Sequence, residues 1–146
     1  MEIRTILKKE RESVIKLIWE TFLMFEAPDY SEEGIETFRL FIFNDDLFEN
    51  TEFFAAFDGK VMKGIIATRD NRKHISCFFV YAEYQKQGIG RKLWDYVRDN
   101  SCASLITVNS SPFAVPIYRR LGFTTLDTER LTDGIRYTPM CFSKLR

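Results

Sequence analysis

The sequence predicts an α+β fold, a mixed α/β sandwich in which one sheet packs against helices. Three observations predict this class. The 146 residues are 45% hydrophobic and 29% charged, the size and balance of one globular domain over residues 1–146. Apolar stripes at helical spacing alternate with short β-prone runs. Two Asp-Gly pairs between such runs indicate hairpins, which belong to antiparallel sheets.

The N-terminal part begins with a strand and a helix. Residues 2–7 alternate enough to predict a short strand. Residues 8–25 carry an apolar stripe at helical spacing that includes Leu17 and Phe22, and Pro28 follows the stripe. Because proline disfavours a helical residue before it, we expect the helix to end near residue 25.

A second helix is predicted over residues 32–43. Ser31 is a favoured N-cap residue, and Glu32 and Glu33 place negative charge in the first turn, where the helix dipole stabilises it. The polar residues 44–50 then predict a break without regular structure.

The central part predicts three antiparallel strands. Residues 53–57 and 61–68 flank Asp58-Gly59, a strong hairpin signal. The polar residues 70–73 form the next turn, and the apolar, β-prone run 74–81 forms the third strand. A helix over 88–99 follows, because apolar residues recur there at helical spacing.

A strand and a further helix come next. Residues 104–108 are a short β-branched run. Ser111-Pro112 predicts a helix start, with a capping hydroxyl and proline at the first helical position. Pro116 would then lie one turn inside the helix and bend it slightly. Gly122 is a typical C-terminal residue of a helix.

The last part predicts two strands, 123–129 and 136–142, on either side of a turn at Asp133-Gly134. The complete order is β-α-α-β-β-β-α-β-α-β-β. We find no internal repeat, low-complexity tract or linker.

Charge and cysteine content exclude several classes. Lys plus Arg and Asp plus Glu both number 21, so net charge gives no argument for nucleic acid or an anionic membrane. Three scattered cysteines and one histidine make a disulfide framework or a metal site a poor expectation. With no secretory signal or membrane-spanning run visible, we expect a cytoplasmic protein with no nucleic-acid or membrane partner.

The segment Gln85-x-x-Gly88-x-Gly90 lies between the third central strand and the helix over 88–99. Glycines at a helix start let a ligand approach the unpaired amides of the first turn, which suit a pyrophosphate. Lys86, Arg91 and Lys92 add positive charge at the same place. Two alternatives remain: glycines that serve only packing, and a nucleotide site. The latter lacks both a Walker lysine and a third dinucleotide glycine.

A second motif runs from Asn109 to Phe123. Ala114 and Tyr118 are four residues apart, so they share one helix face. A small residue there allows close packing of a ligand, with a hydroxyl one turn further on. The alternative is that Tyr118 is a core aromatic.

Together these motifs resemble the GNAT (Gcn5-related N-acetyltransferase) superfamily along nearly the whole chain. Gln85-x-x-Gly88-x-Gly90 is similar to its pyrophosphate loop, and Ala114-x-x-x-Tyr118 with Gly122-Phe123 is similar to its second cofactor motif. The resemblance implies a central, mostly antiparallel sheet with a splayed parallel pair, flanked by helices. It also implies acetyl-CoA as cofactor, held in the V-shaped gap of that pair.

The resemblance further implies residue roles. Tyr118 would protonate the leaving thiolate, and an amide near Val80 would polarise the thioester carbonyl. The expected cofactor-binding residues are Phe79, Val80, Tyr81, Gln85, Lys86, Gly88, Ile89, Gly90, Arg91, Asn109, Ser111, Ala114 and Tyr118. Ser111 stands where many members have asparagine. No glutamate lies on the strand 75–81, where some members keep their general base.

The resemblance therefore predicts acetyl transfer from acetyl-CoA to a primary amine of a small molecule or peptide, by direct attack. A base could act through water from Glu26, Asp29 or Glu83, or be unnecessary. The residues expected near the acceptor are Phe25, Glu26, Asp29 and Tyr30. The alternative is a catalytically weak acyl-CoA-binding or sensor domain. A homodimer through the last strands is common among similar proteins.

Two other reactive side chains, those of His74 and Cys77, are interpreted as structural and not as catalytic. His74 follows Arg72 and Lys73 at a turn, so we expect a solvated or capping histidine. Cys77 has no basic partner visible in the sequence, so we expect a buried structural thiol.

Overall fold

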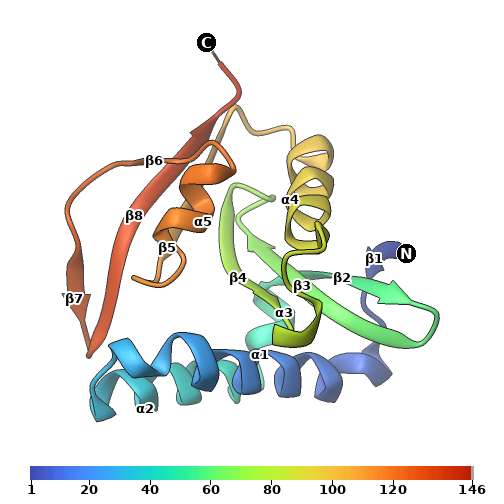
Figure 1. Ribbon diagram of the computed structural model, residues 1–146, viewed down its shortest axis with the longest axis horizontal. Coiled ribbons are helices and arrows are strands. Elements are labelled where there is room, and N and C mark those ends of the chain that lie inside the picture. The colour runs from blue at the N-terminus through green and yellow to red at the C-terminus, as the bar shows by residue number, and fades with distance from the viewer. Residues whose placement is uncertain (146) are drawn as a thin grey trace.

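The structure is a computed structural model that describes residues 1–145. Its main sheet has the strand order β1-β2-β3-β4-β5-β8-β6, and β7 pairs with β8 (Figure 1). The strands are β1 (Glu2–Thr5), β2 (Glu52–Asp58), β3 (Val61–Arg69), β4 (His74–Val80), β5 (Leu105–Ser110), β6 (Thr124–Thr125), β7 (Arg130–Thr132) and β8 (Ile135–Ser143). The helices are α1 (Arg11–Phe25), α2 (Glu32–Ile42), α3 (Leu47–Asn50), α4 (Ile89–Asn100) and α5 (Val115–Arg120), with short 3₁₀ turns η1 (Lys8–Glu10), η2 (Ala27–Asp29) and η3 (Ala82–Tyr84).

The sheet is antiparallel except between β4 and β5, which run parallel. These two strands pair at only two positions, His74 with Thr107 and Ile75 with Val108. Beyond Ile75 the strands separate, and a gap opens in the middle of the sheet. This arrangement confirms the predicted fold class, including the splayed parallel pair.

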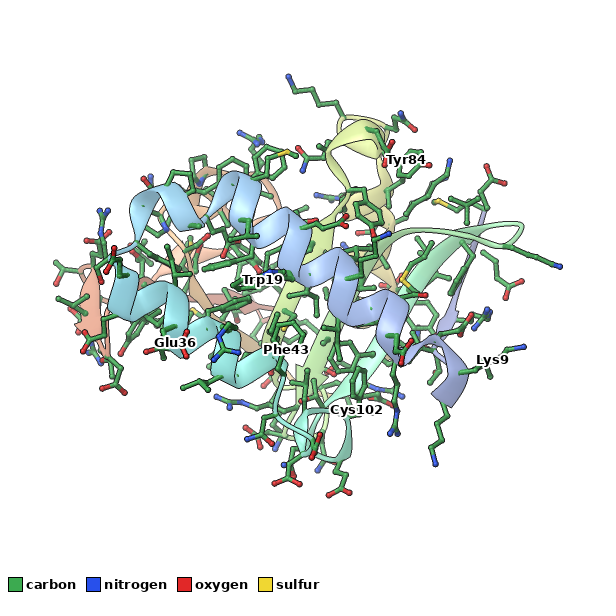
Figure 2. All side chains as sticks on the ribbon, turned by 90° about the horizontal axis from the view of Figure 1, so that it is seen from below. Lys9, Trp19, Glu36, Phe43, Tyr84 and Cys102 are labelled. Carbon is green, nitrogen blue, oxygen red and sulfur yellow. The ribbon has the colours of Figure 1, made fainter. Side chains whose placement is uncertain are left out.

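Two hydrophobic cores lie on opposite faces of the sheet. Because side chains alternate along a strand, Ala55 and Phe57 of β2 pack against α1 and α2, while Phe54 and Ala56 pack against α4. Figure 2 shows α1 and α2 together on one face, with Trp19 on α1 beside Phe43 at the end of α2. The cores fix the helices and therefore the walls of the gap.

Both Asp-Gly turns form where the sequence predicts them. Gly59 has a φ of 60° and Gly134 a φ of 79°, the left-handed conformation that glycine adopts easily. Ser31 is the predicted N-cap of α2, and its hydroxyl accepts a hydrogen bond from the amide of Gly34 at 3.2 Å. No helix among residues 1–145 is long and apolar enough to cross a membrane.

The helix predicted to begin at Ser111-Pro112 begins at Val115 instead. The Ser111 hydroxyl does accept a bond from the Ala114 amide, at 3.3 Å, but it caps a turn that precedes α5. Pro116 therefore lies in the first turn of α5. Backbone amides in the first turn have no intrahelical acceptor, so the lack of an N–H at Pro116 costs no helical hydrogen bond. The predicted bend was wrong for this reason.

Two further predictions were wrong. The expected polar break contains helix α3, which contacts β2 and whose Leu47 is buried in the core, so that a short polar segment is held in place. Within the strand predicted over 123–129, only Thr124 and Thr125 form a strand, β6. The next strand, β7, begins beyond it at Arg130, and the two pair with different parts of β8. Residues 126–129 between them are exposed, so no buried face holds them to the sheet.

Candidate active site

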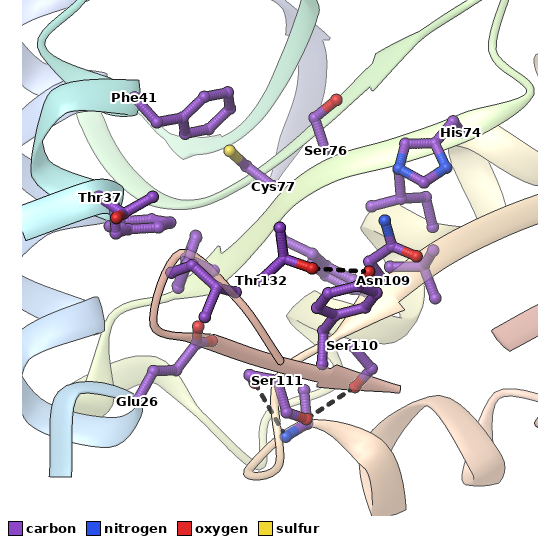
Figure 3. A pocket seen from close by; sticks show the side chains of 18 of the residues that line it. Glu26, Thr37, Phe41, His74, Ser76, Cys77, Asn109, Ser110, Ser111 and Thr132 are labelled. Atoms are coloured by element: carbon purple, nitrogen blue, oxygen red, sulfur yellow. Dashed lines mark hydrogen bonds between the residues drawn. The ribbon is translucent and has the colours of Figure 1, made fainter. Parts of the chain in front are cut away.

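The gap between β4 and β5 opens into a cavity of about 590 Å³. Its floor is β4, and its walls come from the ends of α1 and α2, the end of β5, helix α5 and the β7–β8 hairpin (Figure 3). A β-bulge leaves Ser76 of β4 without a partner residue on β3. The Ser76 hydroxyl is buried at the cavity and makes no hydrogen bond among the described residues. The bulge therefore turns part of the strand toward the open space.

The exposed edge of β4 offers backbone groups to a ligand. The Tyr81 amide is already used, because it donates to the carbonyl of Lys63 at 3.0 Å. Since backbone groups alternate in direction along a strand, the Val80 amide points toward the gap. The Val80 carbonyl accepts a bond from Nε2 of Gln85 at 3.0 Å. Gln85 thus ties the following loop to the end of the strand.

The loop before α4 forms a cradle of backbone amides. Gly88, the N-cap of α4, has a φ of 83°, and a Cβ there would meet nothing within 4 Å. The first backbone bond of the helix is donated by Lys92 to Gly88 at 3.1 Å. Within residues 1–145 the amides of Ile89, Gly90 and Arg91 have no acceptor. Such a row of unpaired amides at a helix N-terminus suits a phosphate group.

Tyr118 of α5 brings a hydroxyl to the cavity. Its ring is 5% exposed and packs edge-on against Phe78 at 6.0 Å and Phe123 at 5.2 Å between ring centroids. The hydroxyl has no hydrogen-bond partner in the described chain, yet the side chain lines the open space. Burial raises the pKa of Tyr118 far above its ordinary value, with smaller contributions from Glu26 and Cys77. The phenol therefore keeps its proton at neutral pH.

Glu26 lies in the cavity lining at the C-terminus of α1, close to Ser111, the residue that follows β5. Burial raises its pKa to about 7, the Ser111 hydroxyl opposes that rise, and the charge of Asp29 adds to it. The carboxylate has no ion-pair partner within residues 1–145. It is thus a carboxyl group poised to gain or lose a proton near neutral pH.

The structure agrees with the expectation for Cys77 but not with the one for His74. Cys77 is 3% exposed, and burial raises its pKa to about 12, so the expectation of a buried thiol is confirmed. The expectation for His74 was wrong. Its ring is half-buried, its Nδ1 lies 2.8 Å from Oγ1 of Thr107, and it joins β4 to β5 where they pair. Burial lowers the pKa of His74.

The structure brings part of the predicted site together around the cavity. The lining includes Glu26, Tyr30, Phe79, Asn109, Ser111, Ala114 and Tyr118. The predicted residues Val80, Tyr81, Gln85, Lys86, Gly88, Ile89, Gly90 and Arg91 lie outside it, along the strand end and the amide cradle. Ile89 packs in the core at 3% exposed, so only its backbone could meet a ligand.

Two residues expected near the acceptor do not reach the cavity. Phe25 stacks on Phe113 with ring centroids 5.0 Å apart, and Asp29 is exposed to solvent. In their place the cavity is lined by residues that the sequence did not single out, among them Arg69, Thr37, Thr132 and Tyr137. The last two come from the β7–β8 hairpin. Its Asp-Gly turn was visible in the sequence, but its position over the cavity was not.

Comparison with known proteins places the chain in a family. The model for the acetyltransferase (GNAT) domain matches residues 26–144. The chain belongs to the GNAT acetyltransferase family, a family of acyltransferases. No curated protein matches the sequence.

Solved structures share the fold. A Gcn5-related N-acetyltransferase from Rhodopseudomonas palustris has a TM-score of 0.84 and 20% identity over 97% of this chain and 94% of its own. The PaiA N-acetyltransferase from Thermoplasma acidophilum, solved with coenzyme A, has a TM-score of 0.76 and 20% identity over 97% and 98%. The ribosomal-protein-S18-alanine N-acetyltransferase from Escherichia coli has a TM-score of 0.66 and 18% identity over 97% and 92%.

Proposed function

We propose that the protein transfers an acetyl group from acetyl-CoA to a primary amine. One observation carries this proposal: the protonated Tyr118 hydroxyl is unbonded and faces the cavity that opens where β4 leaves β5. A tyrosine that serves only packing usually hydrogen-bonds its hydroxyl to another protein group when it is buried. Family membership and the coenzyme A in the Thermoplasma relative support the choice of cofactor.

The residues of this chain fit coenzyme A. The amide cradle of Ile89, Gly90 and Arg91 suits the pyrophosphate, with the positive end of the α4 dipole behind it. The outward amide of Val80 suits the pantetheine arm as an added strand. Asn109, Ser111 and Ala114 line the opposite side of the gap. Acetyl-CoA would supply the acetyl group as a thioester, whose C–S bond breaks as the N–C bond forms.

Two side chains would move the protons of this reaction. Glu26 accepts the proton lost by the amine nitrogen, and Tyr118 donates a proton to the departing sulfur. Both face the same cavity, so transfer from the carboxyl group to the phenolate restores the starting state. Of the acids considered as base, Asp29 is exposed and Glu83 lies outside the cavity. Glu26 is therefore our choice.

The proposal predicts that acetyl-CoA stabilises the folded protein. Because the ligand binds only the folded gap, a free concentration 100 times Kd should add about 2.7 kcal/mol to the free energy of unfolding. Thermal melts across a cofactor titration measure this gain. An unchanged Tm at millimolar acetyl-CoA would contradict coenzyme A binding.

Gly90→Glu should abolish acetyl-CoA binding without unfolding the protein. A Cβ at Gly90 would make ordinary contacts, at 3.7 Å to the Phe78 ring and 3.9 Å to Val80. The new carboxylate, however, would repel a phosphate at the cradle. Calorimetric titration tests this, with Ser13→Glu on the exposed face of α1 as a control of equal charge. Unimpaired binding would mean that the loop serves packing alone.

The overall reaction is tested by the release of free thiol from acetyl-CoA in the presence of an amine panel. Amine-dependent release supports the enzyme. Tight acetyl-CoA binding with no release from any amine would favour the alternative, a binding or sensor domain with the same fold. The absence of a glutamate on β4 keeps this comparison necessary.

A further inference from the structure

We propose that the acceptor is a small primary monoamine with an apolar or aromatic body, and neither a polypeptide nor a polyamine. The inference rests on the N-acetyltransferase function proposed above and narrows its acceptor. Two independent observations carry it. One is the attachment of the β7–β8 hairpin to helix α2, and the other is the distribution of charge along the cavity.

The tip of the hairpin lies directly against the first turn of α2 (Figure 1). Gly134 of the tip and Gly34 of the helix meet backbone to backbone, so a Cβ added to either residue would overlap the other. Gly134 also has a left-handed φ of 79°. Two glycines thus allow a contact that any side chain would hold apart.

Hydrogen bonds reinforce this contact on both sides. Oγ1 of Thr37 donates to the carbonyl of Asp133 at 2.7 Å. Oη of Tyr30 donates to the carbonyl of Arg136 at 3.2 Å, and Nη1 of Arg136 donates to the carbonyl of Asp29 at 3.1 Å. Glycine packing and three bonds between η2, α2 and the hairpin close the groove that would otherwise run between these elements.

The attachment therefore leaves no open groove for a main chain between α2 and the hairpin tip. Thr132, Asp133 and Tyr137 of the hairpin line the cavity opposite β4. An extended peptide needs about 3.3 Å of open groove for each residue, on one side of an N-terminal amine and on both sides of an internal lysine. The hairpin occupies that length. The cavity volume of about 590 Å³ lies within the range of small-molecule sites.

Charge is distributed unevenly in this space. Glu26 stands on one side of the cavity and His74 on the other, as Figure 3 shows, and Arg69 pairs with His74 across β3 and β4. Asp133, the other acid in the lining, is exposed at the hairpin tip. An amine therefore has one inner carboxylate to meet. A second ammonium group would approach Arg69, whose half-exposed guanidinium lies 3.9 Å from the exposed Asp70 carboxylate.

The surface between these ends is aromatic. Phe38 and Phe41 of α2, Phe79 of β4 and Tyr30 line it, and the rings of Phe38 and Phe79 meet edge to face at 6.2 Å. Such walls suit an apolar or aromatic body and disfavour a second, unpaired charge. The acceptor class follows from this combination of one inner carboxylate, aromatic walls and a cation at the far end.

The test compares kcat/KM for 2-phenylethylamine, spermidine, and hexapeptides bearing either a free N-terminal alanine or an internal lysine, each measured by thiol release. We expect 2-phenylethylamine to exceed each of the others by about 10-fold or more. Peptide or spermidine turnover equal to or better than that of 2-phenylethylamine would overturn the acceptor class alone. If none of these amines supported thiol release, the N-acetyltransferase function would be contradicted, and the inference with it.

Charge reversal tests the role of Arg69. Arg69→Glu should raise the ratio of spermidine to 2-phenylethylamine turnover about 10-fold, because a repulsive contact becomes attractive. Lys73→Glu makes the same charge change on an exposed turn residue outside the cavity and should leave the ratio unchanged. Equal ratios in the two variants would contradict the role of Arg69.

Loosening the hairpin tests the closure. Thr37→Val removes the bond to Asp133 with little change in shape and should raise peptide turnover about 5-fold, the effect of one lost hydrogen bond on an opening equilibrium. Thr125→Val, on exposed β6, is the matched control. Peptide turnover that is equal in the two variants would contradict closure by the hairpin.

Discussion

Replacing Tyr118 with phenylalanine should lower kcat by about 100-fold or more, the usual contribution of a positioned proton donor. The hydroxyl makes no hydrogen bond in the described chain, so its loss removes no structural contact. The ring would keep its packing against Phe78 and Phe123. Affinity for acetyl-CoA and the Tm should therefore change little.

Steady-state kinetics with varied amine, together with cofactor titrations, check this expectation. The loss should be equal in kcat and kcat/KM, as for an interaction made only in the transition state. Phe123→Leu, a packing change beside the same ring, is the control for a purely structural effect. Full activity in Tyr118→Phe would make the hydroxyl dispensable, and a collapse of acetyl-CoA affinity would make it a binding contact.

Replacing Glu26 with glutamine should also lower kcat/KM by about 100-fold near neutral pH, because no base then accepts the proton of the amine. In the native protein the carboxyl must be ionised to act, so kcat/KM should rise with pH through about 7. The variant should lose this inflection. A second rise of kcat/KM at higher pH, caused by deprotonation of the substrate ammonium group, should remain.

Asp29→Asn is the matched control, because Asp29 is an exposed acid three residues away on the same loop. It removes a neighbouring negative charge that raises the pKa of Glu26, so its inflection should shift to slightly lower pH with activity retained. An inflection near 7 that persists in Glu26→Gln would assign the base to another group.

Glu26 should also lower the stability of the native protein at high pH. Its pKa is raised from 4.5 to about 7, so between these values the folded state holds a proton that the unfolded chain has released. The free energy of unfolding therefore falls as pH rises through this window and stays lowered above it. Urea unfolding should find Glu26→Gln more stable than the native protein at pH 8 but not at pH 4.5. A stability difference that is the same at both pH values would contradict a buried carboxyl.

Much of the fold follows from local signals. In the turns at Asp58-Gly59 and Asp133-Gly134, the residues Gly59, Asp133 and Gly134 have left-handed backbone, which glycine and aspartate adopt more easily than most residues. Helix α2 begins directly after Ser31, because the Ser31 hydroxyl accepts a hydrogen bond from the Gly34 amide in the first turn. Such effects act within a few residues, so a single sequence contains them.

The errors arise where tertiary contacts decide. Ser111 and Pro112 are residues that typically start a helix. In the structure they form a turn in the cavity wall, and α5 begins three residues after Pro112. Helix α3 is stabilised by the burial of Leu47 in the core, and the local sequence pattern does not predict this burial. His74 is half-buried and contacts Thr107, which lies far along the chain, so the residues around His74 in the sequence do not reveal this partner.

The candidate site divides in the same way. Its glycine loop and Tyr118 belong to compact motifs, so the sequence alone reveals them. Thr37 and Arg69 face the cavity because three-dimensional packing brings α2, the hairpin and the end of β3 together. The bulge at Ser76 depends on the register between β3 and β4, which a single strand does not specify.

The gap in the sheet is bounded by attachments at both of its ends. At one end His74 and Ile75 join β4 to β5, and at the other Gly34 and Gly134 join α2 to the hairpin. A single attachment would leave the two parts free to rotate about it, whereas two separated attachments remove that rotation. The protein then holds the opening at its working width before any ligand arrives. Binding in a space of fixed width loses little conformational entropy, so affinity there depends chiefly on how well a molecule matches the shape already present.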